Sequence, residues 1–79
     1  MRIQLSLYAS LGSHLPEKGQ GNACTLEIQE GTAVRDILCQ LNIGLDVPKI
    51  IFLNGIHAGL DDVLKNGDRL AVFPPIAGG

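Results

Sequence analysis

Charged and aromatic residues are scarce in this chain of 79 residues. Only 18% of the residues are charged and 4% are aromatic, and tryptophan is absent. Six basic and eight acidic residues give a net charge of −2, and they are spread along the chain without runs. Binding to nucleic-acid phosphates needs clustered Lys and Arg, so we expect no nucleic-acid partner.

Long hydrophobic runs and cysteine clusters are missing as well. The longest uncharged apolar stretch falls well short of the ~20 residues that a bilayer-spanning helix requires. Residues 1–5 alternate between polar and apolar and lack the apolar block of a signal peptide, so we expect a cytoplasmic protein that does not enter a membrane. Cys24 and Cys39 are too few for a metal or iron–sulfur site. No metal is predicted, and both thiols are interpreted as ordinary reduced cysteines.

Apolar residues are abundant enough for one folded domain. They make up 46% of the chain, which indicates a packed core and not a disordered segment. We predict a single domain over residues 1–79, with residues 74–79 as an extended tail. A catalytic cleft is difficult to build from so small a chain, so the size favours a carrier, an adaptor or a subunit over an enzyme.

The first half of the chain predicts two strands, a loop and a helix. Apolar and polar residues alternate over 2–8 and 24–29, as in half-buried strands. Glycines and a proline predict a long loop between them, at 9–22, whose role is left open and whose leucines are expected to fold over the core. Apolar residues at 34, 37, 38 and 41 lie on one face of a helix. Thr32 is its predicted N-cap, and Gly44 is the predicted left-handed residue beyond its end.

The second half predicts three more strands. They cover 50–53, 56–58 and 69–73, and Asn54-Gly55 is the hairpin signal between the first two. Residues 61–65 are compatible with one turn of helix, and Asn66-Gly67-Asp68 reads as a turn with a purely structural role. This order of elements predicts an α+β domain, in which one helix lies across one mixed sheet.

The most distinctive segment is the end of the sequence. It consists of Phe73, Pro74, Pro75, Ile76, Ala77, Gly78 and Gly79. The prolines lack a backbone N–H, so they end the strand ladder and keep the chain extended. The glycines offer a backbone without Cβ that can enter a narrow channel. We interpret the chain as a rigid carrier that delivers its terminal carboxylate to the active site of another protein.

These features resemble those of a known family. The residues concerned are Asn54-Gly55, Leu64 followed by Asn66-Gly67-Asp68, and the run from Phe73 to Gly79. With them the element order resembles the ubiquitin-like β-grasp fold. The ending resembles MoaD, the small subunit of molybdopterin synthase, and more distantly ThiS, the sulfur carrier of thiamine synthesis. The resemblance implies a mixed sheet of four to five strands, one main helix and an extended Gly-Gly tail.

The resemblance also implies a sulfur relay. A MoeB-type enzyme would use ATP to adenylate the carboxylate of Gly79, and a sulfur donor protein would convert it to a thiocarboxylate. The tail, made of Pro74, Pro75, Ile76, Ala77 and Gly78, would then enter a MoaE-type large subunit within a heterotetramer. There the sulfur would pass to a pterin precursor of the molybdenum or tungsten cofactor. The chain itself would bind no cofactor and would not be catalytic alone.

Three outward-facing residues are expected to form a docking surface. If the first and last strands are parallel neighbours, as in the β-grasp fold, Tyr8 and Phe73 end at the same edge as an exposed aromatic pair. Aromatic residues are typical interface anchors. His57 is expected on the same surface, which gives a predicted partner-binding patch of Tyr8, His57 and Phe73 that leads into the tail.

Other functions remain compatible with the sequence. A ThiS-type carrier for thiamine, or a carrier for another pathway such as tRNA thiolation, would use the same tail chemistry, although the run Phe73-Pro74-Pro75 favours the molybdopterin type. A ubiquitin-like modifier would attach the same Gly-Gly end to lysines of other proteins. A β-grasp binding module with an inert tail is the third class.

Overall fold

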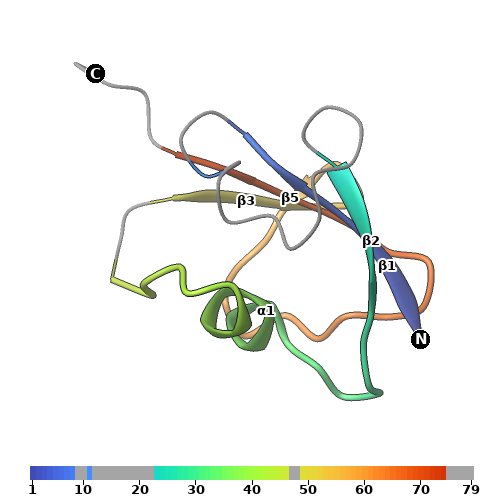
Figure 1. Cartoon of the computed structure of the whole chain (residues 1–79). Coiled ribbons are helices and arrows are strands. Elements are labelled where there is room, and N and C mark those ends of the chain that lie inside the picture. The colour runs from blue at the N-terminus through green and yellow to red at the C-terminus, as the bar shows by residue number, and fades with distance from the viewer. Residues whose placement is uncertain (9–10, 12–22, 47–48, 75–79) are drawn as a thin grey trace.

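A five-stranded sheet with one helix against it makes up the body of the protein (Figure 1). The computed structural model describes residues 1–8, 11, 23–46 and 49–74. In chain order the elements are β1 (Arg2–Leu7), β2 (Ala23–Glu27), α1 (Val34–Gln40), β3 (Ile50–Leu53), β4 (Ile56–His57) and β5 (Arg69–Phe73). The predicted α+β arrangement is therefore confirmed. Residues 75–79 of the predicted tail lie outside the described residues.

The sheet is mixed because its first and last strands run side by side in the same direction. Its order is β2-β1-β5-β3-β4. Strand β1 is parallel to β5, with Leu5 opposite Leu70, and all other neighbours are antiparallel. A parallel pair needs a long crossover connection, and here the crossover from β1 to β5 contains the helix. The parallel arrangement that the resemblance implied is thus confirmed.

The core lies between the sheet and the helix. Its buried side chains are Ile3, Leu5, Leu7, Leu11, Val34, Ile37, Leu38, Leu41, Ile43, Ile51, Leu64, Leu70 and Val72. The alternate residues of β1 and β5 that were expected to face inward are among them, as are the apolar residues of the predicted helix face. Leu11, the described residue of the predicted loop at 9–22, is buried as expected. In the described part of the chain, no helix is long and apolar enough to cross a membrane.

The helix begins one residue later than predicted. Ala33 is the N-cap residue, and its backbone N–H donates to Asp36 Oδ2 at 2.9 Å. The prediction that Thr32 caps the helix is wrong. Its hydroxyl donates to the carbonyl of Gln29 at 2.6 Å and stabilises the preceding turn instead.

The segment after β4 also differs from the prediction. Residues 61–65 do not form a helical turn. Val63 instead makes an isolated bridge with Ala33, and the carbonyls of Asp62 and Leu60 accept hydrogen bonds from the N–H groups of Val34 and Arg35. The first N–H groups of a helix have no partner inside the helix. The segment at 60–63 supplies carbonyl groups for these N–H groups, and it is extended instead of helical because it pairs with the start of α1.

The helix ends in a Schellman motif around Asn42. Asn42 has a φ of 63°, its N–H donates to the carbonyl of Cys39, and the N–H of Ile43 donates to Leu38. Gly44 was predicted for the left-handed position, and that prediction is wrong. Placing Asn42 there lets the next residue, Ile43, return to the core as a buried side chain.

Candidate docking surface before the tail

Among the described residues, no helix or strand covers the sheet face opposite α1, which we call the open face. The strand register decides which side chains lie on it (Figure 1). Ser6, Ala71, Phe52 and His57 stand in one row across β1, β5, β3 and β4. Their sequence neighbours Leu7, Val72 and Ile51 point to the core. Because side chains alternate along a strand, Tyr8 and Phe73 follow on the same open face.

Four rings form a continuous row on this face. Tyr8 and Phe73 stack with ring centroids 4.2 Å apart and an interplanar angle of 4°. Phe52 meets Phe73 edge to face at 5.9 Å, and His57 meets Phe52 in the same way at 5.8 Å. We call Tyr8, Phe73, Phe52 and His57 the aromatic row. Aromatic contacts of this kind each contribute about 0.5–1.5 kcal/mol beyond the area they bury, so the row is a preorganised apolar surface.

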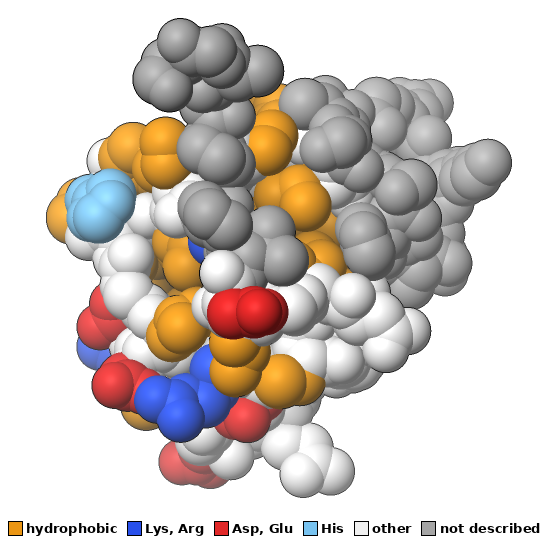
Figure 2. Space-filling model, turned by 90° about the vertical axis from the view of Figure 1, so that its left-hand side faces the viewer, with side chains coloured by type: hydrophobic (Ala, Val, Ile, Leu, Met, Phe, Trp, Pro, Cys, Tyr) orange, Lys and Arg blue, Asp and Glu red, His pale blue; other side chains and the backbone are white. Residues whose placement is uncertain are grey.

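A shallow hollow of about 390 Å³ lies along the aromatic row. It is lined by Ser6, Tyr8, Phe52, Gly55, Arg69, Ala71 and Phe73. A space-filling view shows hydrophobic side chains next to a histidine at the upper left, while most charged side chains gather lower down (Figure 2). Three rings of the aromatic row, those of Tyr8, Phe52 and Phe73, therefore line the hollow.

Hydrogen bonds fasten the hairpin that presents Phe52 and His57. Asn54 and Gly55 have φ values of 55° and 81°, as a two-residue type I′ turn requires. Asn54 Nδ2 donates to Asp68 Oδ1 at 2.9 Å, and Asn54 Oδ1 accepts the N–H of Arg69 at 2.9 Å. Asp68 is buried, and its Oδ2 accepts the N–H of Lys65 at 2.7 Å. The hairpin is therefore tied to the start of β5, the strand that leads into the tail.

Three of the predicted site residues fall on this surface. The structure brings Tyr8 and Phe73 into contact and places His57 on the same face, with the ring of Phe52 between His57 and Phe73. Pro74 follows β5 directly and is half-buried. Pro75, Ile76, Ala77, Gly78 and Gly79 lie outside the described residues. The contribution of all these residues to partner binding and sulfur chemistry stays a prediction.

The sequence interpretation missed Phe52. It treated residues 50–53 as one apolar run and gave Phe52 no role. The signal was present, because a two-residue turn at Asn54-Gly55 pairs Phe52 with His57 across the hairpin. A predicted patch that contains His57 should therefore have contained Phe52 as well. Among the described residues, no group of three or more His, Cys, Asp or Glu side chains could hold a metal ion.

A family model agrees with this architecture. The model described as the ThiS family matches residues 16–79. The chain belongs to the ThiS family. No curated protein matches the chain.

Solved structures share the fold over nearly the whole chain. SAMP1 from Haloferax volcanii is 22% identical with a TM-score of 0.73, and the match covers 100% of both chains. The putative molybdopterin converting factor subunit 1 from Pyrococcus furiosus is 22% identical with a TM-score of 0.69, over 95% of this chain and 98% of that one. A complex of subunits 1 and 2 of molybdopterin-converting factor from Helicobacter pylori matches at 23% identity and a TM-score of 0.61, over 100% of both chains.

The predicted β-grasp fold is thus confirmed. Together with the fold, the family model makes the chain a small β-grasp carrier protein of the ThiS family.

Proposed function

We propose that the chain is the sulfur-donating small subunit of a molybdopterin synthase. The observation that supports this best is the aromatic row, which ends at Phe73, the residue directly before the Pro-Pro-Ile-Ala-Gly-Gly tail. An apolar docking surface at the base of a reactive tail is what a protein cosubstrate needs. The Phe-Pro-Pro run and the likeness to proteins named molybdopterin converting factor subunit 1 support the molybdopterin pathway over other sulfur pathways.

The proposed chemistry concerns the carboxylate of Gly79. A free carboxylate is a poor acyl donor, because the group that would leave is an oxide. A MoeB-type partner attaches AMP from ATP to one carboxylate oxygen and releases pyrophosphate. A persulfide of the donor protein then attacks the carbonyl carbon, and AMP leaves with the oxygen, which divides one difficult step into two easier ones. A second thiol reduces the resulting acyl disulfide, so that the thiocarboxylate of Gly79 is released and the two donor sulfurs are left as a disulfide. The chain binds no cofactor itself, since the partner uses the ATP.

The body of the protein serves the tail by docking. Tyr8, Phe52, His57 and Phe73 anchor the chain on a MoaE-type large subunit, and the tail from Pro74 to Gly79 reaches into the active site of that subunit. The two prolines reduce the freedom that the tail loses on entry, and this lowers the entropic cost of binding. In the resulting heterotetramer this chain lies at the periphery.

Intact mass spectrometry tests the carrier function. The chain is incubated with the MoeB-type enzyme of its source organism, ATP and a sulfur source. Exchange of one terminal oxygen for sulfur is the expected result, and a chain that lacks Gly79 should show no change. Adding the large subunit and a pterin precursor should return the carboxylate and produce the dithiolene, with two thiocarboxylate chains consumed for each dithiolene because each chain supplies one sulfur. A chain that never gains sulfur, under conditions in which the same enzyme thiolates another carrier, would overturn the proposal.

Protein modification is the second candidate. It is favoured by the structural likeness to SAMP1 from Haloferax volcanii, at a TM-score of 0.73. A modifier is activated in the same way but ends in an isopeptide bond to a lysine of another protein. Proteins whose mass is raised by that of this chain, which disappear when Gly79 is removed, would favour this function. Thiolated chain without a pterin product would instead favour a ThiS-type carrier for thiamine or a carrier for tRNA thiolation.

A further inference from the structure

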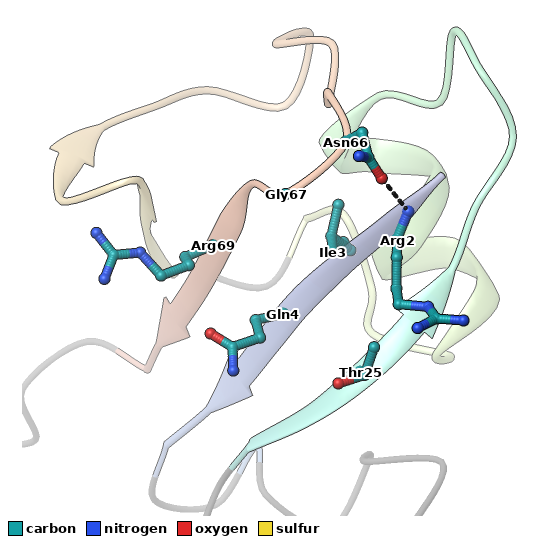
Figure 3. A pocket seen from close by; sticks show the side chains of 7 residues that line it. All are labelled: Arg2, Ile3, Gln4, Thr25, Asn66, Gly67 and Arg69. Carbon is teal, nitrogen blue, oxygen red and sulfur yellow. Dashed lines mark hydrogen bonds between the residues drawn. The ribbon is translucent and has the colours of Figure 1, made fainter.

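Arg69 stands between the apolar and the polar parts of the open sheet face. It lines the aromatic hollow and also a second depression of about 510 Å³. The second depression is formed by Arg2, Ile3, Gln4, Thr25, Asn66, Gly67 and Arg69 (Figure 3). Among the described residues, Arg69 alone belongs to both sets. A partner that fills the aromatic hollow therefore meets this guanidinium at its edge.

The charge of Arg69 is not balanced by its neighbours. The Arg2 guanidinium lies 2.8 Å from Glu27 Oε1, and Arg35 pairs with Asp61. Arg69 has no ion pair within the part of the chain that the structure describes. Arg2 and Glu27 cancel on the open face, so Arg69 gives the described strands of this face a net positive charge, although the whole chain carries −2.

The backbone that carries the guanidinium is held rigidly. The N–H of Arg69 donates to Asn54 Oδ1 at 2.9 Å, and its carbonyl accepts the N–H of Asn54 at 2.8 Å. The preceding residue, Asp68, is buried and hydrogen-bonded to Asn54 and Lys65. The Arg69 side chain therefore projects from a fixed point of the sheet, at the edge of the aromatic hollow.

The arrangement fits one carboxylate better than a phosphate. Figure 3 shows that the side chains of Arg2 and Arg69 point away from each other, on opposite sides of Gln4. A phosphate clamp would need them to converge, and Arg2 is already occupied by Glu27. An exposed single charge at the edge of an apolar surface mainly sets association rate and specificity.

We propose that Arg69 is a specificity-determining contact that pairs with an Asp or Glu of the large subunit, beside the apolar side chains that enter the aromatic hollow. This inference rests on the proposed function, since it names the acceptor subunit of that function. The partner should therefore present an apolar anchor flanked by a carboxylate. A partner without the carboxylate should bind more slowly.

Binding kinetics with the large subunit of the source organism test the pairing. At low salt, Arg69→Glu should bind about tenfold more weakly than the unmodified chain, chiefly through slower association. Arg69→Gln should lose less, and Arg69→Lys should retain most of the affinity. At high salt the differences should shrink, because screening shortens the reach of exposed charges to ~3 Å at 1 M. The matched control is Arg2→Gln, which removes a charge from the same face outside the aromatic hollow and should bind within about twofold.

A charge swap identifies the partner group. Among acidic-to-lysine variants of the large subunit, one should restore the association rate of Arg69→Glu and slow that of the unmodified chain. Arg69→Glu that binds within twofold of the unmodified chain at low salt would overturn the inference.

Mass spectrometry of the same variants separates this inference from the proposed function. Arg69→Glu that gains sulfur normally yet binds the large subunit weakly would support the assignment to that subunit. Lost thiolation with unchanged binding to the large subunit would overturn it. An unmodified chain that gains no sulfur and does not bind the large subunit would overturn both proposals.

Discussion

The stack of Tyr8 on Phe73 makes the ring of Tyr8 the first side chain to truncate in a test of the docking surface. Its parallel contact at 4.2 Å ends the aromatic row at the edge where the tail begins. Interface hot spots typically cost 2 kcal/mol or more on truncation, which is about thirtyfold in affinity. Tyr8→Ala should therefore weaken binding to the large subunit by about thirtyfold, while Tyr8→Phe, which keeps the ring, should change it little. Isothermal titration calorimetry measures both.

A matched control for this variant lies outside the aromatic row. Val63 is 54% exposed and takes part in the bridge to Ala33 through its backbone. Val63→Ala removes exposed apolar surface of another part of the molecule and should leave the affinity unchanged. Equal losses for Val63→Ala and Tyr8→Ala would mean that the aromatic row has no special part in docking.

Asp68 is the side chain on which the hairpin geometry depends. It accepts hydrogen bonds from Asn54 Nδ2 and from the N–H of Lys65 while it is buried. Asp68→Ala leaves both donors without this partner, and hydrogen bonds to charged groups contribute about 1.5–3 kcal/mol each. We expect the free energy of unfolding to fall by at least about 2 kcal/mol, as measured by urea denaturation. A loss below about 0.5 kcal/mol, the usual effect of surface substitutions, would show that water replaces the carboxylate without cost.

The elements themselves show what sequence patterns can and cannot predict. Alternation placed β1, β2 and β5 and their inward faces correctly, because the period of two residues is a local property of the backbone. The two ends of the helix were predicted wrongly at Thr32 and Gly44, because both ends depend on contacts with residues distant in the sequence. The start is determined by the carbonyls of Asp62 and Leu60, which accept the first N–H groups of the helix. The end is determined by Ile43, whose side chain is buried in the core. Phe52 was missed for a similar reason, since its place follows from pairing with β4.

The end of α1 offers a direct test of this reasoning. Asn42 has a φ of 63°, whereas the described glycines with positive φ are Gly31, Gly55 and Gly67, not Gly44. The left-handed conformation costs a residue with Cβ roughly 1–2 kcal/mol, and Asn tolerates it better than most. Asn42→Ala should therefore lower the free energy of unfolding by about 1 kcal/mol, and Asn42→Gly should be neutral or slightly stabilising. Chemical denaturation should show little change for Gly44→Ala, and a larger loss there than at Asn42 would contradict the Schellman assignment.

In the molecule as a whole, the residues that stabilise the fold and the residues proposed to carry the chemistry lie in different parts of the chain. Every buried hydrophobic side chain of the described core lies between Ile3 and Val72, and the aromatic row is complete at Phe73. In the proposed function, the tail adds the reacting group, the carboxylate of Gly79. Sequence patterns predicted the order of elements and the pair Tyr8 and Phe73. They gave no role to Arg69, because its position beside the hollow follows from the strand register.

A chain that stops at Pro74 tests this separation. Because the described core ends at Val72, we expect the thermal midpoint of unfolding to match that of the full chain, and the shortened chain should gain no sulfur. Its docking surface is intact, so it should compete with thiolated full-length chain for the large subunit and slow the sulfur transfer. Adding Tyr8→Ala to the shortened chain should raise the concentration needed for this competition by about thirtyfold, since the aromatic row then lacks its outer ring. A shortened chain that folds normally but does not compete would mean that the tail alone, and not the open sheet face, holds the chain on its partner.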